Sequence, residues 1–339
     1  MQTTEHIVIT GLGIISPLGY GLKEYANSIY QAITDRNVEN EIIPEIDLDT
    51  LPHGLTKRQI KKLDRFTILA MYAAQSALAD AAWEDNTRHR LGLLIGNAFG
   101  GWSYVEEQMY PLCQNDMSAI NSYVATAWFP AAPQGEISIL NNISGISKTF
   151  SAGALSSAYA IEHGYDLIRT GILDAAIAGG AESPLNQVVY NSLIEAGTIS
   201  TANEYMLVEA AGMLLLERET DALERGGNIY AKIASFAFGR VAEDAIAECL
   251  QNGGLTADQV DLLITTHELN TILLNSLHFT HLQGLSIGAD FSLNVINACL
   301  LMTFNNQKTT FKTILVLGHS QENSFLCAAL TRNQGTDHE

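Results

Sequence analysis

The stretch GISKTFSAGALSSAYAI, residues 145–161, decides the fold that the sequence predicts. Its first part alternates Ile146, Lys148 and Phe150 with the small hydroxyl residues at 147, 149 and 151, which is typical of a β-strand. The segment ALSSAYAIEHGYDLIRTG follows and predicts a helix that ends at Gly171. Such a strand-to-helix corner is where many α/β enzymes carry a nucleophile. Here the corner holds Ala152, Gly153 and Ala154, none of which has a reactive side chain.

The rest of the chain also alternates expected strands and helices. Two further helices are expected over residues 65–83 and 243–254. The pattern restarts after Arg225, so we expect two similar halves around one core, residues 1–221 and a shorter half, residues 222–339. The remaining strands are expected at residues 6–13, 91–101, 174–183, 210–219, 228–239, 260–271, 311–320 and 324–332.

Composition excludes several classes of protein. The chain has 339 residues, of which 47% are hydrophobic and 16% are charged, so we expect a globular protein almost throughout. A formal net charge of -19 argues against nucleic acid or an anionic membrane as a partner. Four scattered cysteines, no secretory leader and no membrane-length apolar run predict a cytoplasmic protein.

Two motif fragments are incomplete, and we therefore expect no cofactor and no metal. Gly11 to Ser16 carries only part of the dinucleotide-binding pattern G-x-G-x-x-G. His267 and Glu268 begin a zinc-binding H-E-x-x-H, but the fifth residue is Thr271.

The order of the motifs resembles the β-ketoacyl synthase family. That family has a thiolase-like fold, an α/β protein of five αβαβα layers made of two similar halves. The resemblance therefore implies this fold for the chain. The segments that carry it are VITGLGIISPLG (8–19), LIGNAFGG (94–101), GISKTFSAGALSSAYAI (145–161), IRTGILDAAIAGGAES (168–183), EAAGMLLLERETDALERGGNIYAKI (209–233) and THELNT (266–271).

The resemblance also implies a catalytic machinery that this chain has largely lost. The family's cysteine, which takes the acyl chain as a thioester, falls on Ala154. The first catalytic histidine is retained as His267, but the second, in a K-x-x-x-G-H segment, has no counterpart; His278 and His281 stand in another context. The family's gating G-F-G-G loop reads Gly318-His319-Ser320-Gln321, so we expect degenerate positions at Ala154, His267 and His319 and no catalysis by the chain alone.

Two functions remain open at this stage. The first is a non-catalytic subunit similar to the chain-length factor of type II polyketide synthases, or to the shortened subunits of aryl-polyene-type pathways, which pairs with an active ketosynthase and shapes its acyl pocket. The second is an active synthase or acyltransferase that uses His267 as a base and Ser156 or Ser157 as the nucleophile.

The strand before the corner is the expected subunit interface. In the family this strand runs along a two-fold axis against its partner's copy, which points to Ile146, Lys148 and Phe150 here. An open edge strand is an aggregation hazard that pairing removes. The expected partner is an active ketosynthase, and a homodimer through the same strand is the alternative.

A basic segment, TKRQIKKLDRF (56–66), stands out in this acidic chain. At helical spacing, its five basic residues form two adjacent stripes. A solvated face is one interpretation, and a docking site for an acyl carrier protein with its phosphopantetheine-bound acyl chain is the other. Family members use basic residues at this position to hold the carrier. The residues in question are Lys57, Arg58, Lys61, Lys62 and Arg65.

Overall fold

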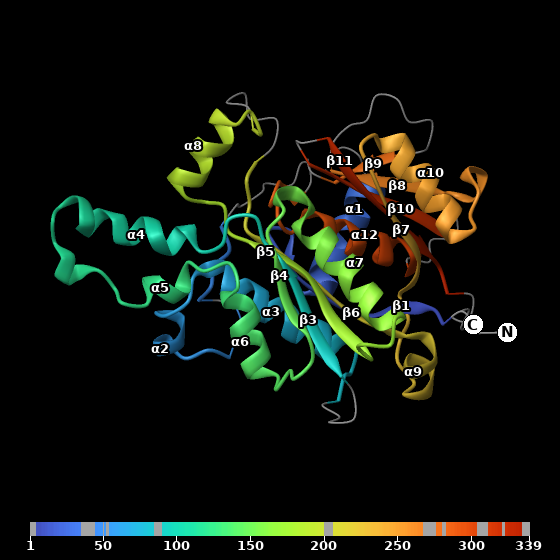
Figure 1. Ribbon diagram of the computed structural model, residues 1–339, viewed down its shortest axis with the longest axis horizontal. Helices are drawn as coiled ribbons and strands as arrows, with labels where there is room; N and C mark the ends of the chain where they lie inside the picture. Colours follow the sequence, from blue (N-terminus) through green and yellow to red (C-terminus); the bar gives the residue numbers. More distant parts are fainter. Residues whose placement is uncertain are drawn as a thin grey trace.

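One large mixed sheet organises the protein, and helices cover it on both faces (Figure 1). The computed structural model describes residues 5–34, 45–49, 51, 54–84, 90–199, 206–266, 276–279, 283–303, 311–320 and 323–333. Its strands are β1 (Ile7–Ser16), β2 (Gly19–Tyr20), β3 (Leu91–Gly96), β4 (Ser147–Phe150), β5 (Ala175–Glu182), β6 (Ala210–Arg218), β7 (Ala231–Gly239), β8 (Leu262–Thr265), β9 (Ser276–His278), β10 (Thr313–Ser320) and β11 (Ser324–Thr331).

The longer helices alternate with these strands, as the sequence predicts for the residues around 65–83, 154–171 and 243–254. None of the described helices is long and apolar enough to cross a lipid bilayer. The helices are α1 (Leu22–Thr34), α2 (Lys57–Ile60), α3 (Arg65–Asp80), α4 (Trp102–Cys113), α5 (Val124–Ala127), α6 (Ala132–Leu140), α7 (Ser156–Arg169), α8 (Gln187–Glu195), α9 (Glu219–Glu224), α10 (Ala242–Gly253) and α12 (Asp290–Thr303).

The two halves of the sheet repeat one topology. The first half runs in the order β4-β3-β5-β6-β1, and the second runs β9-β8-β10-β11-β7. If the short β2 is not counted, the third strand of each half, β4 or β9, lies at the outer edge. Matching neighbours in the two halves pair with the same parallel or antiparallel sense. The halves join where β1 pairs antiparallel with β7. The predicted boundary between residues 221 and 222 falls inside α9 and stays a prediction.

Equivalent helices occupy equivalent layers. α3 and α10 pack on the outer faces of the two half-sheets, while α7 and α12 pack against each other and against both halves in the middle. This is the expected five-layer αβαβα arrangement. Figure 1 shows α7 crossing in front of the sheet, while α4 and α5 extend away from it.

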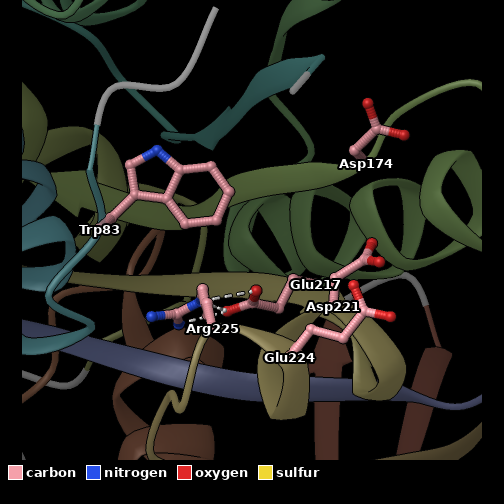
Figure 2. A pocket seen from close by; sticks show the side chains of 6 residues that line it. All are labelled: Trp83, Asp174, Glu217, Asp221, Glu224 and Arg225. Carbon is pink, nitrogen blue, oxygen red and sulfur yellow. Dashed lines mark hydrogen bonds and ion pairs between the residues drawn. The ribbon is translucent and has the colours of Figure 1, made fainter. Parts of the chain in front are cut away.

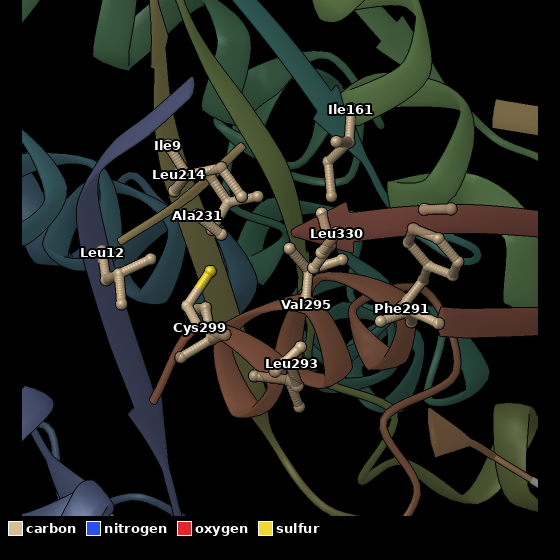
Figure 3. Packing of buried hydrophobic residues seen from close by; sticks show 14 of the residues in the cluster. Ile9, Leu12, Ile161, Leu214, Ala231, Phe291, Leu293, Val295, Cys299 and Leu330 are labelled. Atoms are coloured by element: carbon tan, nitrogen blue, oxygen red, sulfur yellow. The ribbon is translucent and has the colours of Figure 1, made fainter. Parts of the chain in front are cut away.

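The central layer buries the largest hydrophobic cluster (Figure 3). It joins side chains of both halves, including Ile9 and Leu12 of β1, Ile161 of α7 and Phe291 of α12. Every side chain of α12 from Asp290 to Met302 is buried. The sequence did not predict this helix, because a helix buried on every face has no polar stripe to reveal its period.

Gly96 fixes how closely β3 and α7 approach each other. A methyl group on its Cα would lie 2.3 Å from the backbone carbon of Ser156 and 2.4 Å from the nitrogen of Ser157. The backbone of α7 cannot retreat without losing its contacts in the central layer. The glycine therefore seats the start of α7 directly on the end of β3.

We expect Gly96→Ala to destabilise the protein by about 1–3 kcal/mol, the usual range for forcing an extra methyl into a packed site. The free energy of unfolding in denaturant titrations measures this. Gly135→Ala is the matched control, because Gly135 lies in α6 with nothing within 4 Å of an added methyl. That control should be neutral or slightly stabilising, and equal losses in both variants would contradict the explanation.

Candidate functional site

The predicted strand-to-helix corner is present at the end of β4. The chain leaves β4 at Phe150, makes the short 3-10 turn Gly153–Leu155 and enters α7 at Ser156. Gly153 has a φ of 57°, a left-handed conformation that favours glycine. Ala154 stands at the centre of the turn, half-buried, and packs against an apolar cluster that includes Val189 and Leu285.

Both serines after the corner use their hydroxyl groups in the structure. The Ser156 Oγ accepts a hydrogen bond from the Ala152 N–H at 2.9 Å and lies 2.6 Å from the Gly153 carbonyl oxygen, to which it donates. The Ser157 Oγ accepts from the Ser292 N–H at 3.3 Å. Both side chains are fully buried. They cap and join helices and do not point into an open site.

The N-termini of α7 and α12 meet at this corner. The Ser157 N–H donates to the Gly288 carbonyl at 3.2 Å, while Ser157 accepts from the first turn of α12. Gly288 has no room for a side chain, since an added methyl would lie 2.3 Å from the Glu182 Oε2. Gly318 of β10 is similarly pressed against Leu155 and Phe291. Both halves of the protein therefore supply walls of the same corner.

Two buried carboxyl groups lie beside the helix N-termini. Asp290 accepts hydrogen bonds from the Ser286 N–H, the Ser286 hydroxyl and the Ile287 N–H, and burial raises its pKa. Glu182, at the end of β5, accepts the Ala98 N–H. Burial raises the pKa of Glu182 to about 8, against the lowering effect of its backbone hydrogen bonds. Burial therefore favours the protonated, neutral form of Glu182.

Sequence reasoning missed Glu182, although it belongs to the segment DAAIAGGAES that predicted β5. An acidic residue at the end of an otherwise apolar strand was the available signal. Its Oε1 and the Oδ1 of neighbouring Asn97 are both buried and have no hydrogen-bond partner among the described residues. The described residues also contain no cluster of His, Cys, Asp and Glu side chains suited to a metal ion.

Among the expected histidine positions, the structure describes the side chain of His319 but not those of the others. His267 and His281 lie outside the described residues, as does the side chain of His278. His319 follows Gly318 on β10 and stacks on Phe325, with ring centroids 4.5 Å apart. The corner thus offers helix N-termini, which stabilise negative charge, but its central residue carries only a methyl group.

The interface strand is confirmed as an edge strand. Within the described residues, β4 pairs only with β3 and stands at the end of the sheet. Ile146 precedes it, and Lys148 and Phe150 lie within it. Lys148 is exposed, with its Nζ 2.9 Å from the His163 Nε2, and Phe150 packs edge-on against the same imidazole. The predicted interface residues therefore lie together along one open border.

The basic segment does not form the continuous helix that its spacing predicts. α2 ends at Ile60, and Asp64 caps a new helix by accepting the Phe66 N–H at 3.0 Å. The two stripes expected at helical spacing therefore do not lie on one helix. Lys57, Arg58 and Lys61 are exposed.

The other two basic residues have partners within the chain. The Lys62 ammonium lies 4.9 Å from the centre of the Tyr123 ring. The Arg65 Nε donates to the buried Glu209 at 2.6 Å, and a second guanidinium nitrogen bonds the Ile46 carbonyl. Arg65 thus stabilises the fold, and the exposed basic set is reduced to Lys57, Arg58 and Lys61.

A separate acidic pocket lies far from the corner (Figure 2). Asp174 precedes β5 there, whereas Glu182 ends the same strand. Its carboxylates are largely paired: Arg225 binds Glu217 at 2.5 Å, and Arg90 and Arg218 hold the pKa of Asp174 well below its usual range. The lining residues are Trp83, Asp174, Glu217, Asp221, Glu224 and Arg225. This arrangement stabilises the strand ends and brings no reactive group together.

Known proteins resemble this chain in sequence over most of its length. The model of the β-ketoacyl synthase N-terminal domain matches residues 31–222. Nodulation protein E of Rhizobium leguminosarum bv. trifolii is 25% identical over 327 residues, which cover 86% of this chain and 82% of that protein. The tetracenomycin polyketide synthase ketoacyl synthase beta subunit of Streptomyces glaucescens is 29% identical over 264 residues, covering 70% of this chain and 64% of that one. The chain thus spans slightly less than two thirds of this second relative.

Solved structures show the same fold at lower identity. One chain from the complex of a type II PKS acyl-carrier protein with its ketosynthase superposes with a TM-score of 0.82 at 21% identity, covering 98% of this chain and 100% of that one. The ishigamide ketosynthase/chain length factor superposes with a TM-score of 0.78 at 17% identity, with the same coverage.

The raised pKa of Glu182 predicts a specific pH dependence of stability. Its carboxyl group has a pKa of about 8 in the folded protein and 4.5 as a reference for the unfolded chain. Between these values the folded state holds a proton that the unfolded state releases, so stability falls as pH rises. Relative to Glu182→Gln, the wild-type free energy of unfolding should fall between pH 5 and 8, by at most about 1.4 kcal/mol per pH unit.

Denaturant titrations of both proteins across this pH range measure the difference. Glu195→Gln is the control, because Glu195 is exposed on α8 and should leave the wild-type slope unchanged. A Glu182→Gln protein with the wild-type pH slope would show that Glu182 is ionised in the folded state.

Proposed function

Because the chain belongs to the β-ketoacyl synthase family, we propose that it is a non-catalytic subunit, similar to a chain-length factor, that pairs with an active ketosynthase. In this role it would help to shape the partner's acyl pocket during type II polyketide or fatty-acid-like chain elongation. The proposal places this complex in the cytoplasm, with an acyl carrier protein as its second partner.

The observation that carries the proposal is Ala154 at the centre of an intact corner. A thioester intermediate needs a nucleophilic atom at this position, and a methyl group cannot attack a carbonyl. The neighbouring hydroxyl groups of Ser156 and Ser157 are buried and hydrogen-bonded to backbone groups. This disfavours the alternative of an acyltransferase with a serine nucleophile.

Three further observations support pairing. β4 is an open edge strand, and exposed backbone groups at a sheet edge are satisfied by another strand. The similar proteins include a ketoacyl synthase beta subunit and a ketosynthase/chain length factor. Large apolar side chains also stay exposed in the region of α4 to α6, among them Tyr110, Met117 and Phe129. Such surfaces on a single chain favour burial by a partner.

The isolated chain should not condense malonyl and acyl carriers, and Ala154→Cys alone should not restore turnover. The restored thiol would still lack the second histidine of the decarboxylating site. Product formation from purified carriers measures this, and intact-protein mass should show no acyl adduct on the wild-type chain. Addition of the cognate ketosynthase is the positive control. Steady condensation by the wild-type chain, free of any ketosynthase, overturns the proposal.

The exposed basic residues Lys57 and Lys61 should contribute to carrier docking. Reversing both, by Lys57→Glu and Lys61→Glu, should raise the carrier's apparent KM for the complex. The expected loss is about 1 kcal/mol per exposed contact at most. It should shrink as salt rises, because surface charges are screened within about 8 Å at physiological ionic strength.

Lys23→Glu with Lys312→Glu is the matched control, since both lysines are exposed and lie outside the basic segment. This control should leave the apparent KM unchanged. Rates with a small carrier-free thioester should be unchanged in both double variants. If Lys57→Glu with Lys61→Glu keeps the wild-type KM at low salt, the segment is only a solvated face.

A further inference from the structure

The open border of β4 is defined by its hydrogen bonds to β3. The Leu93 N–H donates to the Ile146 carbonyl and the Asn97 N–H to the Phe150 carbonyl, each at 3.0 Å. Backbone groups alternate in direction along a strand, so Lys148 also bonds towards β3 and Thr149 directs its N–H and carbonyl away from the sheet. The outer border therefore consists of the backbone groups of Ser147 and Thr149, and the Ser147 carbonyl accepts a hydrogen bond from the Gln134 Nε2 at 3.3 Å.

The two faces of β4 differ in their contacts. On one face the Thr149 hydroxyl donates to the Gln134 Oε1 of α6 at 2.8 Å. On the other face Lys148 reaches α7, where its ammonium lies 2.9 Å from the His163 Nε2. Burial and the Lys148 charge lower the pKa of His163, so the neutral imidazole accepts a hydrogen bond from the ammonium.

No carboxylate neutralises Lys148 within the described part of the chain. The acidic side chains on the same stretch of α7 are Glu162 and Asp166. Asp166 is bound by Arg169 at 2.7 Å. Burial raises the pKa of the half-buried Glu162. The exposed border of a strongly acidic protein thus carries an uncompensated positive charge.

Self-pairing of this strand would bring two such charges together. In an antiparallel pair, two directly opposite residues point their backbone groups the same way, both towards the partner strand or both away from it. A two-fold axis between two copies of β4 therefore places one residue directly opposite its own copy. If that residue is Lys148, the two lysines lie directly opposite each other, with Cβ atoms about 5 Å apart. If that residue is Ser147 or Thr149, the two lysines are diagonal neighbours on one face, about 7–8 Å apart. Each register near the strand's centre therefore places like charges side by side.

We propose that Lys148 selects the partner: it disfavours pairing of β4 with a second copy and favours a related chain that carries a carboxylate at the matching position. This inference rests on the proposed pairing role and deepens it by naming the chemistry of the partner's edge. Like charges across strands destabilise a pair and opposite charges stabilise it, so one residue discriminates in both directions.

Variants of this chain test the idea without a known partner. Sedimentation equilibrium should show that Lys148→Met self-associates with a dissociation constant at least about tenfold lower than the wild type, equivalent to about 1.4 kcal/mol. Wild-type self-association should strengthen between about 0.05 and 0.5 M salt as the repulsion is screened, and that of Lys148→Met should not. Lys23→Met, on α1, is the matched control and should behave as the wild type.

A charge-swap experiment supplies the proposed carboxylate. Tagged Lys148→Glu mixed with untagged wild type should form mixed pairs in excess of the statistical fraction of about one half. Adding Thr149→Pro to Lys148→Met should abolish the association, since it removes the outward N–H but no hydrogen bond to β3.

The outcomes separate the two proposals. A Lys148→Met chain that self-associates no better than wild type, mixed pairs at or below the statistical fraction, or association that survives Thr149→Pro overturns the role of Lys148. Failure of the pairing function appears differently, as a co-expressed ketosynthase that binds neither wild type nor Lys148→Met.

Discussion

The meeting of two helix N-termini at the centre of the molecule is the constraint on which the rest depends. The first-turn N–H groups of a helix have no acceptor within the helix, and burying them unsatisfied is costly. Here Ser157 of α7 donates to the carbonyl of Gly288 and accepts from Ser292 of α12, so each half satisfies the other. The corner is therefore needed for folding even where its central residue is Ala154. The packing of the two halves therefore does not depend on a reactive side chain at position 154.

Much of this fold was predictable from the sequence, and the exceptions have physical causes. The apolar runs of β1, β5 and β6, which are buried along nearly their whole lengths, were located correctly. Gly171 ends α7 with a φ of 73°, as its position after the last periodic residue predicted. The missed helix, α12, lacks a polar face, so periodicity has no signal there. The basic segment was wrongly predicted to be one continuous helix, because Asp64 caps a second helix within it.

The candidate site was less accessible to sequence reasoning. Motif order located Ala154, and strand alternation located β4, whose position at the edge is confirmed. Spacing along the chain cannot show which buried hydroxyl group forms a hydrogen bond with a distant backbone group, as Ser157 does with Ser292. Nor can it show that Arg65 turns inward to Glu209, 144 residues away, instead of joining the exposed lysines. These are long-range contacts that only the packed halves create.

The crowding at the corner has an evolutionary consequence. Gly96, Gly180 and Gly288 touch the backbone or side chains of neighbouring elements so closely that no larger residue fits without displacing them. Ala154 instead packs its methyl group against an apolar cluster. The three glycines are therefore constrained by packing alone, whatever residue stands at position 154. A mutation that removed one of them would be selected against through folding, so the motifs that identify the family report the fold and not the activity.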